Sequence, residues 1–291
     1  MIWKRLLNID RRIVFLAMGL GIVLPLLFPT ELPVGAQRVT QRLFDTVDAI
    51  DPDERCLFIS GDYTPQNMPE THPMTIALLR HAFAARIPVI VNALYVEGAP
   101  LMATGIEEVM EEFNSRATSS ADSVIYGREI VYLGWQPPPI VPILGMGESI
   151  HAVYPDDYYG NRIDSLELME RTQNYDDVGI VVAITGLAAP LWYVMFAQPK
   201  YGLAVGAGCT AVCAPDFYPY VGTGQMAGMM AGMKGAAEYE EMVEQKYHTA
   251  GRRKATEGMV AQSAAHLCIM GFVILGNLAY FMMRREKEKQ S

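Results

Sequence analysis

The stretch IPVIVNALY, residues 87–95, decides the fold class of this chain. It is an unbroken apolar run, rich in β-branched residues, with one polar residue, Asn92, near its end. Such a run indicates a strand buried on both faces, as strands of parallel sheets are. The runs CLFIS (56–60) and DVGIVVAIT (177–185) have the same character. Together they predict the centre of a mostly parallel sheet.

The segments between these runs predict helices. Residues 69–86 read as one helix, and residues 100–113 place apolar side chains at helical spacing with glutamates on the opposite side. We expect another helix from Asp164 onward, and further strands within 123–135 and 201–208. The alternation of strands and helices predicts an α/β fold, Rossmann-like or flavodoxin-like, with helices on both faces of the sheet.

Both ends of the chain predict membrane helices that flank this fold. Residues 13–29 form the first predicted span, after a basic segment at 1–12, and residues 259–283 form the second, before a basic tail at 284–291. A span needs ~20 mostly apolar residues, so the first segment is short. The alternative is a cleaved signal peptide that ends at the small residues 34–36.

The basic residues beyond the apolar segments predict the orientation. Because Lys and Arg favour the cytoplasmic side, we expect both ends of the chain in the cytoplasm. The connecting helix at 36–50 and the α/β domain at 51–247 then lie on the outer side of the cytoplasmic membrane, with the lipid bilayer as a partner. Residues 178–198 are uncharged and could invert this order by spanning. Gly186 and Pro190 favour a strand and a helix inside the domain instead.

The composition of the chain and the motifs that it lacks exclude several classes of function. The net charge of −9 argues against nucleic acid as a partner, because duplex binding depends on Lys and Arg. The motifs GxSxG, GxxxxGK[ST], HExxH and CxxC are missing, so no catalytic residue, cofactor or metal is predicted. The segment 206–211 matches GxGxxA, but Pro215 follows and the strand comes last, so a dinucleotide fingerprint is not inferred. Whether Cys209 and Cys213 pair stays open.

Polar side chains follow several predicted strands and suggest a small-ligand site. In open α/β sheets ligands bind at the carboxyl ends of the strands. Each residue on its own is also explained by turns and helix caps. The candidate ligand-binding residues are Ser60, Asp62, Asn92, Glu97, Thr185 and Asp216.

A glycine- and methionine-rich stretch at 221–240 predicts a contact surface. Gly224, Gly228 and Gly232 are four residues apart, so in a helix they would share one face. Three uses are open: helix pairing in a bilayer, a phosphate cradle at 222–224, or close packing against the sheet or another subunit. The candidate interface residues are Gly224, Gly228, Met229, Gly232 and Met233.

The segment PDFYPYVGTGQMAGMMAGMKGAAEYE, residues 215–240, resembles the signature of a family of prokaryotic integral-membrane proteins with a domain of unknown function. The shared pattern is GQxxGxxxGxxGAAEYE. The resemblance covers about the last third of the predicted domain. It implies a membrane protein with an α/β domain, and it brings no activity and no catalytic residues.

Two functions follow as hypotheses. The first is a non-enzymatic, structural subunit of an oligomeric membrane assembly, which contacts copies of itself or other membrane proteins through 221–240. The second is a ligand-binding or hydrolytic domain with its site at the strand ends. The two anchors and the missing catalytic motifs favour the first.

Overall fold

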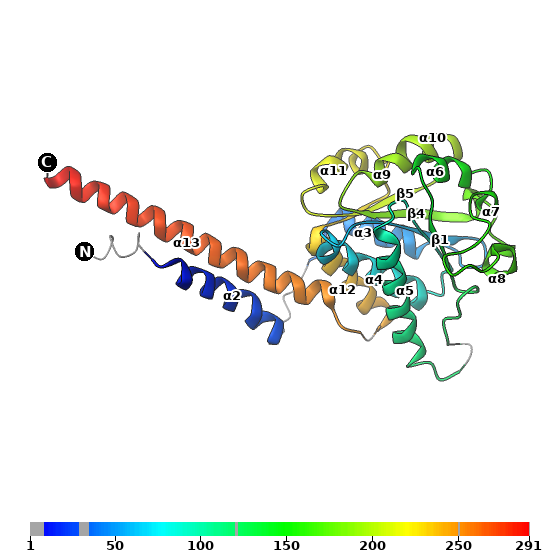
Figure 1. Ribbon diagram of the computed structural model, residues 1–291, viewed down its shortest axis with the longest axis horizontal. Coiled ribbons are helices and arrows are strands. Elements are labelled where there is room, and N and C mark those ends of the chain that lie inside the picture. The colour runs from blue at the N-terminus through cyan, green and yellow to red at the C-terminus, as the bar shows by residue number, and fades with distance from the viewer. Residues whose placement is uncertain (1–8, 29–34, 120–121, 250, 291) are drawn as a thin grey trace. The chain divides into compact units, whose positions relative to one another are not determined.

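The computed structural model describes residues 9–28, 35–119, 122–249 and 251–290 (Figure 1). The chain divides into two compact units. One is the domain Val34–Ala255, and the other combines Met1–Pro33 with Thr256–Ser291. The predicted connecting helix therefore belongs to the domain, where it buries Leu43 and Val47.

The domain is built on a six-stranded sheet with the order β3-β2-β1-β4-β5-β6, in which every neighbouring pair is parallel. This is the strand order of Rossmann-like folds. The prediction of a parallel α/β fold is confirmed. The strands are β1 (Cys56–Asp62), β2 (Val89–Ala93), β3 (Ile130–Trp135), β4 (Val178–Thr185), β5 (Val205–Cys209) and β6 (Met229–Ala231).

Helices cover both faces of the sheet. On one face lie α3, α4, α5 and α12, and on the other lie α6, α9, α10 and α11 (Figure 1). The longer helices are α3 (Arg38–Asp48), α4 (Met68–Ala84), α5 (Gly98–Asn114), α11 (Ala214–Gly222) and α12 (Gly232–Tyr247). The shorter ones are α6 (Ile140–Met146), α7 (Ile150–Val153), η1 (Ile163–Ser165), α8 (Glu167–Glu170), η2 (Tyr175–Asp177), α9 (Ala189–Trp192), η3 (Tyr193–Ala197) and α10 (Gln198–Tyr201).

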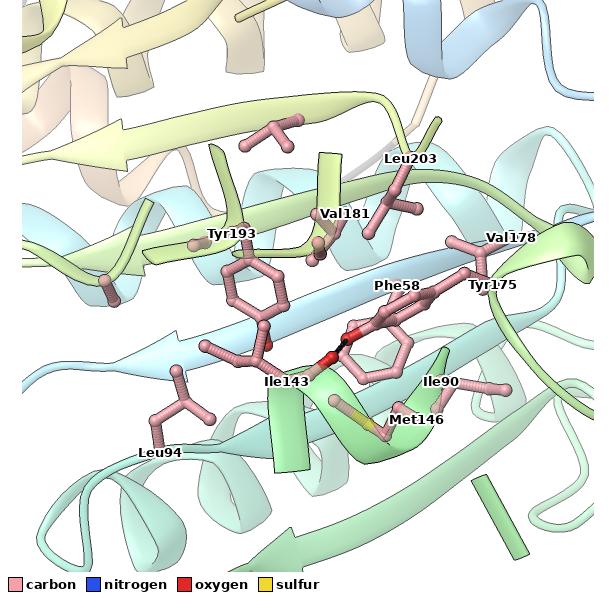
Figure 2. Close-up of a cluster of buried hydrophobic side chains, with 14 of the residues drawn as sticks. Phe58, Ile90, Leu94, Ile143, Met146, Tyr175, Val178, Val181, Tyr193 and Leu203 are labelled. Atoms are coloured by element: carbon pink, nitrogen blue, oxygen red, sulfur yellow. Dashed lines mark hydrogen bonds between the residues drawn. The ribbon is translucent and has the colours of Figure 1, made fainter. Parts of the chain in front are cut away.

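The core under the second group of helices is apolar and joins strands to helices (Figure 2). Phe58 and Val181 project from neighbouring strands towards Ile143 and Tyr193, and all four are buried. The Tyr175 hydroxyl donates a hydrogen bond to the Ile143 carbonyl at 2.8 Å. Burying such side chains contributes about 1.5–3 kcal/mol each. This packing holds α6 and η3 over β1 and β4.

The other unit contains α2 (Arg11–Leu27) and most of α13 (Lys254–Gln290). Among the described residues, the helical segment Lys254–Arg285 is the one stretch long and apolar enough to cross a membrane. Helix α2 is apolar and exposed but has only 17 residues. A Cβ atom at Gly21 would lie 2.9 Å from the Cys268 sulfur, so α2 packs closely along α13. Within the described ranges there is thus one candidate span where two were predicted, and residue 29 of the first predicted span lies outside these ranges.

Two predicted helices differ from the structure. The helix expected from Asp164 is wrong, because the segment forms only the short turns η1 and α8. Residues 221–240 are not one helix either: α11 ends at Gly222, β6 follows at Met229–Ala231, and α12 starts at Gly232. Strand β6 pairs with β5 instead of continuing a helix.

The ambiguous segment 178–198 lies within the domain. It forms β4 and the helices after it, as the glycine and proline in its middle predicted. The strand pairs with β1 on one side and β5 on the other, which satisfies its backbone groups inside the sheet.

Candidate functional site

A buried polar cluster lies at the carboxyl ends of β1, β2 and β4. Ser60, Asp62, Asn92 and Thr185 are all fully buried there. The connections after β1 and β4 run over opposite faces of the sheet, so the chain reverses direction between these two strands. Ligands of open α/β sheets bind in the crevice at this switch point. The structure thus brings four of the six predicted site residues together.

Asp62 accepts hydrogen bonds from Ser60 in β1, from Leu94 just after β2 and from Thr185 in β4, and Ser60 links this network to η3. Its Oδ2 accepts from Ser60 Oγ at 2.7 Å, and its Oδ1 accepts from the Leu94 backbone N–H at 2.6 Å. Ser60 Oγ in turn accepts from the Tyr193 hydroxyl at 3.0 Å. Thr185 Oγ1 donates to the Asp62 carbonyl at 3.0 Å. The carboxyl is fixed in position without a cation as partner in any of these bonds.

Burial raises the pKa of Asp62 to about 7, against the opposing effect of the hydrogen bonds from Ser60 and Leu94. Removing a carboxylate from water disfavours its charged form, so the proton is held more tightly. Asp62 can therefore gain or lose a proton near neutral pH, where an ordinary aspartate is fully ionised. A carboxyl of this kind can donate as well as accept a hydrogen bond.

Only one of the two polar atoms in the Asn92 side chain has a hydrogen-bond partner. Its Nδ2 donates to the Tyr154 hydroxyl at 3.4 Å, a long contact. Among the described residues, no donor reaches its Oδ1, although that oxygen is buried. An unpaired buried carbonyl costs about 1–3 kcal/mol, so it needs an explanation. A bound ligand that donates a hydrogen bond would supply one.

Two aromatic side chains lie beside the cluster and are only partly buried. Tyr95 directly follows Leu94, and Trp192 directly precedes Tyr193, so each is the chain neighbour of a residue that bonds to the cluster. Their ring centroids are 5.9 Å apart. Burial, and then the charge of Asp62, raises the pKa of Tyr95. The charge of Asp62 thus acts on Tyr95, whose side chain is itself partly exposed.

Glu97 and Asp216 do not join the cluster. Both side chains are exposed, Glu97 at the N-cap of α5 and Asp216 in the first turn of α11. They were predicted to share one cleft with the other four residues, but both side chains are exposed to solvent at the starts of α5 and α11. Glu97 and Asp216 nevertheless place negative charge at the edge of the sheet where the strands end.

The residues predicted for an interface are largely internal. A Cβ atom at Gly228 would lie 2.4 Å from the Leu43 nitrogen, so this glycine lets β6 approach the α3 backbone. Met229 is fully buried. Gly232 adopts a φ of +61° where α12 begins, and Gly224 is exposed with a φ of +80°. Only Gly224 and the half-buried Met233 remain accessible, so the predicted glycine face does not exist.

The end of the same stretch contains buried charges that the sequence did not reveal. Glu238 accepts from Thr40 Oγ1 at 2.6 Å and Glu240 lies 3.7 Å from Arg80. Between them, the Tyr239 hydroxyl is 2.7 Å from His81 Nδ1. All three side chains are buried. They attach α12 to α3 and α4 rather than facing solvent.

Three other features among the described residues do not indicate a second site. Within the described ranges, no group of three or more His, Cys, Asp or Glu side chains could hold a metal ion. Cys209 and Cys213 are free thiols. An open hollow of about 320 Å³ lies at the opposite edge of the sheet, but Arg86, which lines it, is paired with Asp122.

Comparison with protein-family models, with curated proteins and with solved structures found no match to this chain. The family suggested by residues 215–240 therefore stays a prediction. The candidate site rests on the geometry of the cluster alone.

Proposed function

We propose that this chain is a membrane-anchored Rossmann-like protein that binds a small ligand at the switch point between β1 and β4. The observation that carries the proposal is the unpaired, buried Oδ1 of Asn92 beside a carboxyl, Asp62, that titrates near neutral pH. Both groups lie where folds of this topology bind ligands. The site holds one free acceptor and one exchangeable proton.

The surroundings define the class of ligand. Asn92 Oδ1 requires a donor, such as a hydroxyl or an amide N–H. Asp62, Glu97 and Asp216 repel an anion at this edge, and the half-exposed Glu70 sits in the first turn of α4, where a phosphate would otherwise bind. The ligand is therefore a neutral or cationic molecule with a hydrogen-bond donor. The partly exposed rings of Tyr95 and Trp192 offer it aromatic surface.

The membrane arrangement belongs to the same proposal. Helix α13 supplies one span, and α2, which packs along it, supplies the second. Basic residues lie in the last turns of α13 and at the start of α2, so both ends stay in the cytoplasm and the domain lies outside. The domain then meets ligands of the outer compartment.

A thermal-unfolding screen tests the ligand class. The full chain in detergent is heated with neutral alcohols and amides, amines, carboxylates and phosphates. A ligand present at 100 times its Kd stabilises the folded state by about 2.7 kcal/mol. We expect stabilisation by hydrogen-bond donors among the neutral alcohols and amides or among the amines. The same compounds should not stabilise the double variant Asn92→Leu/Tyr154→Phe. Stabilisation by phosphates alone would contradict the proposal.

A second candidate function, a subunit of a membrane assembly, is favoured by one observation. Helix α6 exposes Ile140, Val141 and Leu144 in one short segment. Neighbouring exposed apolar residues of this kind mark contact surfaces. Native mass spectrometry of the gently extracted protein tests it: a defined homo-oligomer that dissociates in Val141→Asp supports assembly, and a monomer in both contradicts it.

A further inference from the structure

The face of the sheet that carries Asp62 and Asn92 is otherwise apolar. Ser60 and Asn92 are paired positions of β1 and β2, and side chains at paired positions of parallel strands point to the same face. Asp62, two residues beyond Ser60, shares that face. Two residues earlier on each strand, Phe58 and Ile90 belong to the buried apolar core on this side (Figure 2). The polar groups therefore end an apolar face, where charges are poorly screened.

Most hydrogen-bond donors of the cluster are already used inside it. The Ser60 hydroxyl donates to the Asp62 carboxyl, and the Tyr193 hydroxyl donates to Ser60. The Thr185 hydroxyl donates to the Asp62 carbonyl. Acceptors are left over, because Asn92 Oδ1 has no donor among the described residues and the Asp62 carboxylate keeps unused lone pairs. A molecule that fits the cluster must therefore supply several donors.

The Asp62 carboxyl also lacks a positive partner among the described residues. Its two oxygens accept from the Ser60 hydroxyl and the Leu94 backbone N–H, which are both neutral. A buried carboxylate without a counter-charge is unfavourable, which is why burial raises the pKa of Asp62 to about 7. A bound cation would supply the missing charge and favour the ionised form.

Aromatic side chains lie around this carboxyl. Burial raises the pKa of Tyr95, Tyr154 and Tyr193, and in each case the negative charge of Asp62 contributes in the same direction. These three titratable groups of the neighbouring segments therefore stay neutral near pH 7. The ring centroid of Tyr95 lies 5.9 Å from that of Trp192, and both side chains are partly exposed. The faces of such rings attract ammonium groups.

Acidic residues at the same edge of the sheet favour a cation as well. Glu97 and Asp216 are exposed at the starts of α5 and α11. The half-exposed Glu70, in the first turn of α4, accepts a hydrogen bond from the Ala211 backbone N–H at 2.8 Å, in the loop after β5. Carboxylates gathered at one edge raise the local concentration of positively charged molecules.

We propose that the ligand of this site is a primary organic ammonium ion. This inference rests on the function proposed above and narrows its class of ligand. The ammonium group donates a hydrogen bond to Asn92 Oδ1 and pairs with the ionised carboxylate of Asp62. Its organic part lies against the rings of Tyr95 and Trp192. A neutral alcohol would satisfy Asn92 but leave the carboxylate without a counter-charge, and a quaternary ammonium would bring the charge without a donor.

Three probes with the same carbon chain test the proposal on the full chain in a non-ionic detergent. They are n-butylamine, which is protonated at neutral pH, 1-butanol, which is a neutral donor, and butyltrimethylammonium, which is a cation without a donor. Isothermal titration calorimetry measures their binding at pH 8 and pH 6. We expect butylammonium to bind most tightly at pH 8 and about tenfold more weakly at pH 6, because a carboxyl with a pKa of about 7 is mostly protonated at the lower pH.

The variant Asp62→Asn removes the charge and keeps the shape of the side chain. We expect it to bind butylammonium about tenfold more weakly or worse at pH 8 and to lose the pH dependence, while it still binds 1-butanol. Asp53→Asn, at an exposed position, is the matched control and should bind as wild type does. Since the pH dependence is measured on wild type, the test does not require the variant to fold.

The outcomes separate this inference from the proposed function. If 1-butanol or butyltrimethylammonium binds wild type as tightly as butylammonium at pH 8, the ligand is not a primary ammonium, and the proposed site remains. Butylammonium binding that is equal at pH 6 and pH 8 and unchanged in Asp62→Asn would place the cation at the exposed carboxylates and overturn the inference. Binding of none of the three probes to wild type would contradict both the inference and the proposed function.

Discussion

At the scale of single residues, Asp62 makes a testable contribution to the pH dependence of stability. Its pKa rises from 3.8 to about 7 on folding because the carboxyl is buried. The protonated form is therefore favoured in the folded state. The resulting stabilisation is complete below pH 3.8 and is lost as the pH rises to about 7, by up to about 1.4 kcal/mol per pH unit.

Asp62→Asn removes this dependence. We expect the variant to lose less stability than wild type when the pH rises from about 4 to 7, as measured by thermal unfolding of the detergent-solubilised chain. Asp53→Asn, at an exposed position, is the control and should follow wild type. A parallel pH profile for wild type and Asp62→Asn would mean that Asp62 is ionised throughout.

The contribution of His81 to the pH dependence of stability has the opposite sign to that of Asp62. Burial lowers its pKa to about 4, so its neutral form is favoured in the folded state. Its stabilisation is present above pH 6.5 and is lost as the pH falls towards 4. We expect His81→Gln to be less sensitive than wild type to acid in this range, although it is less stable at pH 7 because it loses contacts with Asp48 and Tyr239. Unchanged acid sensitivity would argue that His81 does not titrate.

The site residues that could be predicted from the sequence are those at the carboxyl ends of the strands. Ser60, Asp62 and Asn92 follow from the strand pattern, since parallel strands bring their carboxyl ends to one edge. Tyr154 and Tyr193 could not be predicted, because they reach the cluster from a loop and a helix far along the chain. Their positions depend on how those segments pack over the sheet.

At the scale of elements, the stretch 221–240 shows that the spacing of glycines alone does not predict a helix. Glycines four residues apart fit a helix face, but here Gly224 lies in a loop, Gly228 directly precedes β6 and Gly232 starts α12. Gly228→Ala should destabilise the domain by about 1–3 kcal/mol, because its Cβ would meet the α3 backbone at 2.4 Å. Gly222→Ala, with nothing within 4 Å, should be neutral or slightly stabilising. Chemical unfolding compares the two.

The attachment of α3 to α12 gives a second prediction at this scale. Thr40 donates to the buried carboxylate of Glu238 at 2.6 Å. Hydrogen bonds to charged groups contribute about 1.5–3 kcal/mol, so a double-mutant cycle of Thr40→Val and Glu238→Gln should give a coupling energy of at least about 1 kcal/mol. Additive effects of the two substitutions would contradict this contact.

At the scale of the whole molecule, the class of fold followed from the sequence but the strand order did not. Unbroken apolar runs between amphipathic segments predict a parallel sheet whatever its order. The short strand β6, with only three residues, gives no periodic signal. The order of the strands is decided by long-range packing, such as that of α4 against α12, which local patterns do not contain.

The proposed two-span arrangement makes a prediction about sidedness. An impermeant thiol reagent should label Glu54→Cys, an exposed position in the domain, in intact bacterial spheroplasts. Lys287→Cys in the basic tail should be labelled only after permeabilisation. Both variants carry Cys213→Ser. Labelling in the reverse pattern would place the domain in the cytoplasm.

The central claim is that the cluster around Asp62 and Asn92 holds a small ligand, and native mass spectrometry of the protein from its own membranes tests it most directly. The variant is Asn92→Leu/Tyr154→Phe, which replaces both hydrogen-bonding partners by apolar side chains of similar shape and should leave stability unchanged or higher. The account predicts an additional small-molecule mass on wild type that is missing from this variant. The same mass on both proteins, or none on wild type, would contradict it.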